Sequence, residues 1–254
     1  MHRFYLPSEL CRSDVIQLPE NEAHHAARVL RLEAGERVTV LDGAGHVIDC
    51  EVREVTKRNV SLAALKKTFC PPLPCQITLI QAMPKPKAMD YIVQKATELG
   101  AVRIVPLLTE RVVTQLNERD AEDKAAKLQP VAIEAIKQCG SPWLTKIEPP
   151  VSLKNFLTRR EQFELPLIAS LQSGSQHPRE FIQRFHNTQK RLPKTACLWI
   201  GPEGDFTSAE MELILGSGAL PVTLGSLVLR SDTAAIYGLS VMNYELQSEA
   251  RPIS

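Results

Sequence analysis

Two different patterns of hydrophobic and polar residues divide the chain. Over residues 1–70, short segments alternate apolar and polar positions, which is typical of half-buried strands. Strands are predicted at Arg37–Leu41, His46–Val55 and Asn59–Leu65, with Asp42–Gly45 as a hairpin turn. Only Asn21–Leu32 has apolar residues at helical spacing. This part of the chain is predicted to be a small β-barrel with one short helix.

Residues 69–74 (FCPPLP) contain three prolines and are the predicted linker. From residue 75 onward, strands that are apolar on both faces alternate with helices, as in a parallel sheet covered by helices. Strands are predicted at Gln76–Ala82, Val102–Leu108, Leu165–Leu171, Thr195–Gly201 and Pro221–Leu224. Helices are predicted at Met89–Leu99, at Asp123–Cys139 with a kink or late start at Pro130, at Thr207–Leu215, and at Ser231–Glu249 as the longest. The second domain, residues 75–254, is therefore predicted to be α/β.

Composition narrows the possible functions only a little. The 254 residues are 44% apolar and 23% charged, which suffices for a core without disulfides. A net charge of +1 gives no overall sign of nucleic-acid binding. The six cysteines form no Cys-x-x-Cys pair, so we expect reduced thiols and no metal. Without a signal core or an 18-residue apolar run, the chain is expected to be cytoplasmic and free of membrane segments.

The stretch WIGPEGDFTSAE (199–210) joins a predicted strand to a predicted helix. Thr207 and Glu210 have the spacing of a capping box, which accounts for the helix start. Gly201–Gly204 lies upstream of that start. Its glycines permit positive φ and close approach of another atom to the backbone. The segment is either a stiff turn or one wall of a ligand site, since ligands bind beyond the carboxyl ends of strands in α/β sheets.

A second unusual junction is LGSLVLRSDTAA (224–235). Its apolar stretch Ser226–Leu229 is expected to be buried against protein or to cover an apolar ligand. Arg230 follows at a helix start, where the helix dipole disfavours a cation. It therefore calls for a carboxylate such as Glu203 or Asp205, or for a phosphate. Neither junction matches a dinucleotide, P-loop or hydrolase-elbow signature, so these enzyme classes are disfavoured.

Together the two junctions resemble paired motifs of the RsmE family, 16S ribosomal RNA uracil-N3 methyltransferases of the SPOUT class. The family motifs are Gly-Pro-Glu-Gly-Gly-Phe and Leu-Gly-x-x-Ile-Leu-Arg-x-Glu-Thr-Ala. Three further segments of this chain agree with the family, and the likeness covers nearly the whole sequence. They are HHAARVLRLEAGERVTVLDG (24–43), YIVQKATELGAVRIVPLLTERVV (91–113) and AIEAIKQCG (132–140).

The resemblance implies a PUA-like RNA-binding barrel, an α/β domain with a trefoil knot, S-adenosylmethionine as methyl donor, and a homodimer acting on 16S rRNA in the small ribosomal subunit. It implies that the donor site is lined by three knot segments. Carried over to this chain, these are Leu171, Ile200, Gly201, Glu203, Gly204, Leu224, Gly225, Val228, Leu229 and Arg230.

The reaction suggests roles for two of these residues. Uracil N3 carries a proton, so methylation needs a base or a cation that stabilises the developing anion. Arg230 is the predicted cation and Glu203 the predicted base, with Asp205 as an alternative base. Contacts of the barrel to RNA phosphates are predicted at His25, Arg28 and Arg31, although solvated surface positions are an equally ordinary role for such residues.

The chain departs from the family at five places. Asp205 replaces a glycine, Ser226-Leu227 replaces Pro-Arg, Asp232 replaces a glutamate, Gln172-Ser173 replaces His-Pro, and Ser141-Pro142-Trp143 replaces Arg-Asn-Arg. Two alternatives therefore stay open. One is a SPOUT enzyme that modifies another RNA or a ribose hydroxyl, and the other is a catalytically silent RNA-binding factor in ribosome assembly.

Overall fold

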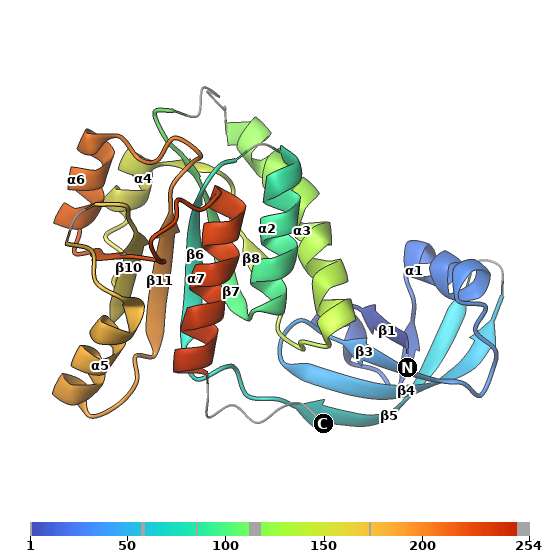
Figure 1. The fold of residues 1–254 in the computed structure, drawn as a ribbon. Coiled ribbons are helices and arrows are strands. Elements are labelled where there is room, and N and C mark those ends of the chain that lie inside the picture. The colour runs from blue at the N-terminus through green and yellow to red at the C-terminus, as the bar shows by residue number, and fades with distance from the viewer. Residues whose placement is uncertain (1, 57–58, 85, 112–117, 173, 248–254) are drawn as a thin grey trace. The chain divides into compact units, whose positions relative to one another are not determined.

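The computed structural model describes residues 2–56, 59–84, 86–111, 118–172 and 174–247 (Figure 1). The chain divides into two compact units. Unit 1 contains Met1–Pro72 together with Ile133–Leu144, and unit 2 contains Leu73–Ala132 together with Thr145–Ser254. Each unit therefore includes two separate stretches of the chain.

Unit 1 is built on a five-stranded sheet in the order β1-β3-β4-β5-β2. Only β1 and β3 pair in parallel, and the other neighbours are antiparallel. One continuous core of apolar side chains fills this unit, including Phe4, Ile16 and Leu62, each fully buried. The strands are β1 (His2–Tyr5), β2 (Val15–Gln17), β3 (Arg37–Leu41), β4 (His46–Val55) and β5 (Val60–Phe69).

The β-rich prediction for this unit is confirmed, with β3 and β4 at the predicted bounds. Strand β5 runs four residues beyond the predicted end at Leu65, to Phe69. The predicted helix Asn21–Leu32 is shorter and irregular: α1 (Glu20–His24) continues directly as one π-helical turn, η2 (His25–Val29). A 3-10 turn, η1 (Ser8–Cys11), lies between β1 and β2.

Unit 2 contains a seven-stranded sheet in which every pair is parallel. The order is β12-β10-β11-β6-β7-β8, and β9 also pairs with β7. Strands β10, β11 and β12 are thus neighbours at one side of the sheet, so their carboxyl ends meet. The strands are β6 (Gln76–Ala82), β7 (Ala101–Leu108), β8 (Lys146–Ile147), β9 (Val151–Ser152), β10 (Leu165–Ala169), β11 (Thr195–Ile200) and β12 (Leu220–Val222).

Helices cover both faces of this sheet (Figure 1). Helices α2 and α7 pack beside each other on one face, where Gly238 of α7 lies so close to Leu198 that a Cβ would approach it to 2.7 Å. Side chains of α4 and α6 share a core cluster with Trp199 on the other face. The helices are α2 (Pro86–Glu98), α3 (Glu118–Cys139), α4 (Leu153–Thr158), α5 (Pro178–Gln189), α6 (Ser208–Gly216) and α7 (Ser231–Leu246).

The α/β prediction is confirmed, but two helix predictions are wrong. Helix α3 begins at Glu118, so Pro130 lies inside it and does not delay its start. With 22 residues, α3 is also longer than the 16-residue α7 in the described part of the chain. Residue 249, the predicted end of the last helix, lies outside the described residues.

Candidate functional site

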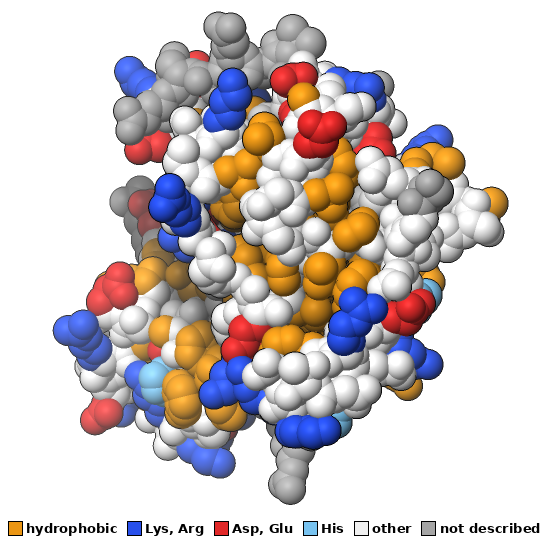
Figure 2. All heavy atoms as spheres, turned by 90° about the vertical axis from the view of Figure 1, so that its left-hand side faces the viewer, with side chains coloured by type: hydrophobic (Ala, Val, Ile, Leu, Met, Phe, Trp, Pro, Cys, Tyr) orange, Lys and Arg blue, Asp and Glu red, His pale blue; other side chains and the backbone are white. Residues whose placement is uncertain are grey.

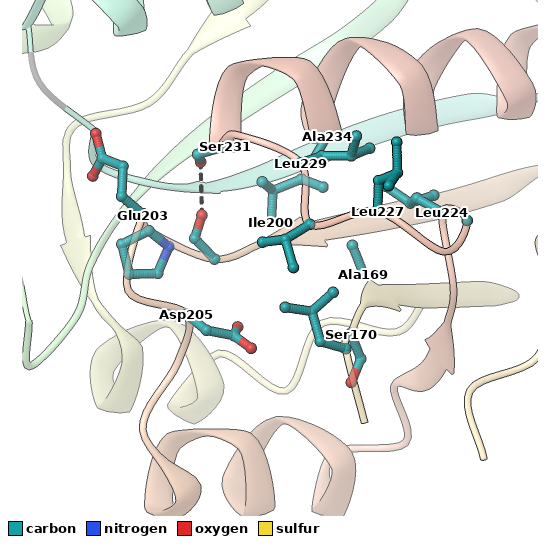
Figure 3. A pocket seen from close by; sticks show the side chains of 15 residues that line it. Ala169, Ser170, Ile200, Glu203, Asp205, Leu224, Leu227, Leu229, Ser231 and Ala234 are labelled. Atoms are coloured by element: carbon teal, nitrogen blue, oxygen red, sulfur yellow. Dashed lines mark hydrogen bonds between the residues drawn. The ribbon is translucent and has the colours of Figure 1, made fainter. Parts of the chain in front are cut away.

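A cavity lies beyond the carboxyl ends of β10, β11 and β12, where three loops meet (Figure 3). Its volume, counted together with the solvent at its open mouth, is about 590 Å³. Aliphatic side chains form most of its wall, and Glu203, Asp205 and Ser170 add polar groups. The lining residues are Ala169, Ser170, Leu171, Ile200, Gly201, Pro202, Glu203, Asp205, Leu224, Gly225, Leu227, Val228, Leu229, Ser231 and Ala234.

The β11 loop uses its glycines for close contacts rather than for positive φ. A Cβ on Gly201 would lie 2.9 Å from the Asp205 carboxylate, and one on Gly204 would lie 3.2 Å from the Arg111 guanidinium. Positive φ falls instead on Asp205, at 62°. The expectation of close approach to the glycines therefore holds, whereas the expected positive φ is found at the next residue.

The start of α6 anchors this loop. Thr207 is the N-cap, and the predicted capping box with Glu210 is present, with both of its hydrogen bonds formed. The Glu210 side chain is buried and also accepts a 2.8 Å hydrogen bond from the backbone N–H of Glu110, just after β7. The Arg111 guanidinium donates to the carbonyl of Asp205 at 3.3 Å. The loop is thus held between helix α6, which follows it, and the segment after β7, two strands away from β11 in the sheet.

The β12–α7 loop presents apolar side chains to solvent. Leu227 is 74% exposed and Val228 is 79% exposed, although both line the cavity. Gly225 has φ of 117°, a conformation that side chains rarely adopt. The expectation that these side chains are buried against other parts of the described chain is therefore wrong.

Figure 2 views unit 2 from the side of α5 and α6 and shows hydrophobic side chains gathered across that face.

Arg230 is the N-cap of α7, with no capping hydrogen bond from its side chain. It is exposed, and within the described ranges it forms no ion pair with Glu203 or Asp205. Ser231 is the first residue of α7, and its hydroxyl donates to the carbonyl of Gly201 at 2.7 Å and accepts from the Gln81 amide at 2.9 Å. This hydrogen bond joins the two loops across the cavity (Figure 3).

Most residues predicted for the donor site lie at this cavity. Eight of the ten line it, while Gly204 and Arg230 do not. Gly204 instead packs on Arg111. Seven lining residues were not in the predicted donor set: Ala169, Ser170, Pro202, Asp205, Leu227, Ser231 and Ala234. Of these, Asp205 was predicted only as an alternative base, and Leu227 only as part of the apolar stretch 226–229. Strand β10 ends at Ala169 instead of Leu171, which accounts for Ala169 and Ser170.

The three residues predicted to contact RNA lie close together in unit 1. His25 and Arg28 belong to the π-helical turn η2, and Arg31 follows it with φ of 55°. All three are exposed. Among the described residues, none of them forms an ion pair, so their charges and donors face solvent. Single π-turns occur frequently at functional sites.

Neither a metal site nor a reactive thiol at Cys197 is found among the described residues. There, no group of three or more His, Cys, Asp or Glu side chains is placed to hold a metal ion. Burial raises the pKa of the Cys197 thiol to about 12, so it stays protonated and is a poor nucleophile at neutral pH. No helix in the described ranges is long and apolar enough to cross a membrane.

The sequence matches two protein families along its length. Residues 71–243 match the RNA methyltransferase domain, and residues 18–65 match the RNA methyltransferase PUA domain. The Ribosomal RNA small subunit methyltransferase E of Aquifex aeolicus is 32% identical, with 95% of this chain and 99% of the relative covered. The protein of the same name from Bacillus subtilis is 29% identical, with 97% and 98% covered.

Solved structures share the fold over nearly the whole chain. A Legionella pneumophila protein described as a methyltransferase, solved with the bound cofactor SAM, gives a TM-score of 0.84 at 32% identity, covering 95% of this chain and 96% of that one. The Ribosomal RNA small subunit methyltransferase E of Neisseria gonorrhoeae, bound to S-adenosyl methionine, gives 0.82 at 28% identity, covering 96% and 97%.

Proposed function

Since the chain belongs to the ribosomal RNA small subunit methyltransferase E family of RNA methyltransferases, we propose that it methylates N3 of a uridine in 16S ribosomal RNA. The methyl donor is S-adenosylmethionine. The observation that carries the proposal is the meeting of three loops around one cavity at the carboxyl ends of neighbouring parallel strands. We also propose that the α/β domain contains the trefoil knot that the resemblance implies.

The chemistry of the cavity suits this donor. An adenine ring needs an apolar slot, and Ile200, Leu224 and Leu229 supply aliphatic walls. The donor also carries a positive sulfonium, and two carboxylates, Glu203 and Asp205, line the same cavity. Exposed Leu227 and Val228 have apolar area that an occupant would cover. The eight predicted residues that line the cavity are our proposed donor contacts, with Gly204 and Arg230 flanking them.

The proposed reaction is an in-line methyl transfer. N3 of uracil bonds to the methyl carbon while the carbon–sulfur bond breaks, and the electrons of that bond stay on sulfur. The N3 proton passes to a base before or during this step. Glu203 is the proposed base because it is exposed at the cavity and has no hydrogen-bond partner among the described residues. Asp205 is less suited, since its Oδ1 already accepts from the Phe206 N–H at 2.8 Å. Arg230 is the proposed cation that stabilises negative charge on the uracil.

The substrate must reach this cavity as an unpaired or flipped nucleotide, because N3 is buried in base pairs. We propose that His25, Arg28 and Arg31 contact its phosphates through unit 1, where exposed cations and a match to a PUA domain support RNA binding. A homodimer and a cytoplasmic location are also proposed. Association is supported by tyrosines on the paired helices α2 and α7, where Tyr91 is 48%, Tyr237 45% and Tyr244 75% exposed.

Mapping of N3-methyluridine in small-subunit rRNA from a deletion strain tests this function. One uridine should lose the modification and regain it when the gene is restored. In the purified protein, Arg230→Ala should lower turnover about 100-fold or more while S-adenosylmethionine still binds in calorimetry. Unchanged rRNA methylation in the deletion strain would refute the proposed reaction. Normal turnover by the variant would remove Arg230 from it.

A further inference from the structure

Unit 1 carries an aromatic cluster that the proposed reaction does not use. His46 at the start of β4, Phe69 at the end of β5 and Trp143 form it. The ring centroids of His46 and Phe69 lie 5.2 Å apart at 58°, and those of Phe69 and Trp143 lie 6.0 Å apart at 79°. Neither neighbour stacks parallel on Phe69, whose side chain is 56% exposed. A large aromatic ring is therefore held with surface open to solvent.

Backbone contacts fix the position of this ring. A Cβ on Gly45 would lie 2.5 Å from Trp143 and 2.8 Å from Phe69, so both rings close directly onto the glycine. The Trp143 indole N–H donates to the carbonyl of Cys70 at 3.1 Å, and the Cys70 N–H donates to the carbonyl of Gly45 at 2.8 Å. The Gly45 N–H donates to the carbonyl of Pro142 at 3.0 Å.

His46 is fixed by a buried carboxylate. Oδ2 of Asp42 lies 2.7 Å from Nδ1 of His46, and Oδ1 accepts from the backbone N–H groups of Ala44 and His46, both at 2.8 Å. Asp42 is only 3% exposed. Phe69 thus lies between two side chains that are themselves held by hydrogen bonds, which preorganises the cluster for a binding partner.

Positive charge lies beside this ring. Lys67 precedes Phe69 by two residues on β5 and therefore points to the same face of the sheet. It lines a hollow together with Arg12 and Lys66. In the described part of the chain, none of these three cations forms an ion pair. Asp14 is the only carboxylate lining the same hollow, so positive charge is in excess there.

We propose that Phe69 and Lys67 form a contact site for single-stranded RNA on unit 1. An unpaired base stacks on the Phe69 ring, and Lys67 binds a neighbouring phosphate. Aromatic platforms beside cations bind single strands in this way because every base has a π-face and every nucleotide a charge. The site rests on the proposed function for its partner, and it is separate from the cations on and after η2. It also gives Trp143, which departs from the family pattern, a role in supporting Phe69.

Equilibrium binding of a fluorescein-labelled oligouridylate of about ten nucleotides to the full chain tests this site, since single-strand sites span roughly 4–16 nucleotides. Phe69→Leu keeps apolar bulk without a ring and should weaken binding about 5- to 100-fold, whereas Phe69→Tyr should bind like the wild type. Lys67→Ala should reduce the slope of log K against log salt by about 0.7. Arg53→Ala is the matched control, because Arg53 is an exposed cation farther along β4.

Intrinsic tryptophan fluorescence gives a second readout, since the chain has two tryptophans and Trp199 is buried. Oligouridylate should change Trp143 emission in the wild type but not in Phe69→Leu. Equal binding by Phe69→Leu and Phe69→Tyr, or an equal loss in Arg53→Ala, would overturn the site. So would Phe69→Leu abolishing a concentration-dependent rise in mass while RNA binding stays normal, because the face would then bind a second copy. None of these assays depends on methyl transfer, so they separate failure of this site from failure of the proposed reaction.

Discussion

Within the β11 loop, Asp205 is the residue that differs from the family motif. Asp205 has φ of 62°, in the left-handed region where glycine has no steric penalty. Aspartate is tolerated there because its side chain bonds locally, as in the 2.8 Å contact from the Phe206 N–H to Oδ1. The glycine of the family motif and the aspartate of this chain are therefore two solutions to one backbone conformation.

Because of this backbone conformation, we expect glycine to be tolerated at position 205 and valine to lower the free energy of unfolding. Asp205→Gly loses one hydrogen bond but also the left-handed strain, so the free energy of unfolding should change by about 0.5 kcal/mol or less. Asp205→Val combines a branched side chain with positive φ and should cost about 2 kcal/mol or more. Urea unfolding of both variants measures the difference. Equal losses would show that the side chain, rather than the backbone, matters at this position.

At the scale of elements, the start of α6 holds the candidate site by a capping box. Thr207 accepts from the Glu210 N–H at 3.3 Å, and Glu210 accepts from the Thr207 N–H at 2.9 Å. Thr207→Ala should lower the free energy of unfolding by about 1 kcal/mol, since it removes an N-cap oxygen. Thr207→Ser keeps that oxygen and should lose less than half as much. Chemical denaturation distinguishes them, and similar losses would mean that the methyl group of threonine, not its hydroxyl, stabilises this helix.

Strands β10 and β11 are joined just before their first residues by a surface ion pair. The Arg191 guanidinium and the Lys194 N–H donate to Glu164 and lower the pKa of its carboxyl from 4.5 to about 2. Because the folded pKa is the lower one, the stabilisation is present above about pH 4.5 and is lost as the pH falls toward 2. The effect should be small, since Arg191 is 42% exposed and solvent screens the pair.

Glu164→Gln should therefore remove part of the acid sensitivity of this unit. The expected result is a flatter dependence of the urea midpoint on pH between about 5 and 2, relative to the wild type. Glu212, an exposed carboxylate of α6, offers a control in Glu212→Gln. An identical pH profile for the wild type and Glu164→Gln would show that the pair contributes nothing to folding.

The sequence pattern predicted long elements well and short ones poorly. Strand β6 has its predicted bounds because seven apolar-rich residues form an unambiguous run. Strands β8 and β9 have two residues each, too few for any periodicity. The same limit applies at the site. The apolar run that ends at Leu171 predicts a strand, but β10 ends at Ala169. The end of this strand is set by tertiary contacts, which the local pattern does not contain. Ser231 shows another limit, since its partners Gly201 and Gln81 are remote in sequence.

At the scale of the whole molecule, the sequence pattern could not predict which distant segments belong to the same unit. Hydrophobic patterns are local, and they predict a domain boundary wherever the rhythm changes, here at residues 69–74. In the structure, Ile133–Leu144 belongs with the first 72 residues, although α3 begins in the other unit. The return of the later segment makes the first unit depend on a part of the chain that no local pattern assigns to it.

This dependence can be measured with fragments. In unit 1, Leu144 donates to the carbonyl of Gly43 at 3.1 Å, Trp143 donates to Cys70, and the Lys137 ammonium lies 3.0 Å from the Glu22 carboxylate. A fragment of residues 1–72 loses all of these contacts and leaves the Gly45 surface uncovered. It should be less stable than the same fragment joined by a flexible linker to residues 133–144, by about 2 kcal/mol or more.

Urea unfolding followed by circular dichroism compares the two fragments, with a scrambled 133–144 sequence as the matched control for chain length. The native segment should raise the midpoint, and the scrambled one should not, because stabilisation depends on the indole and on backbone groups in register. A Trp143→Ala version should lose most of the gain, since the indole both donates to Cys70 and packs against Gly45 and Phe69. If residues 1–72 alone match the joined fragment, the first unit folds without the returning segment, and Trp143 serves the RNA site rather than the stability of the sheet.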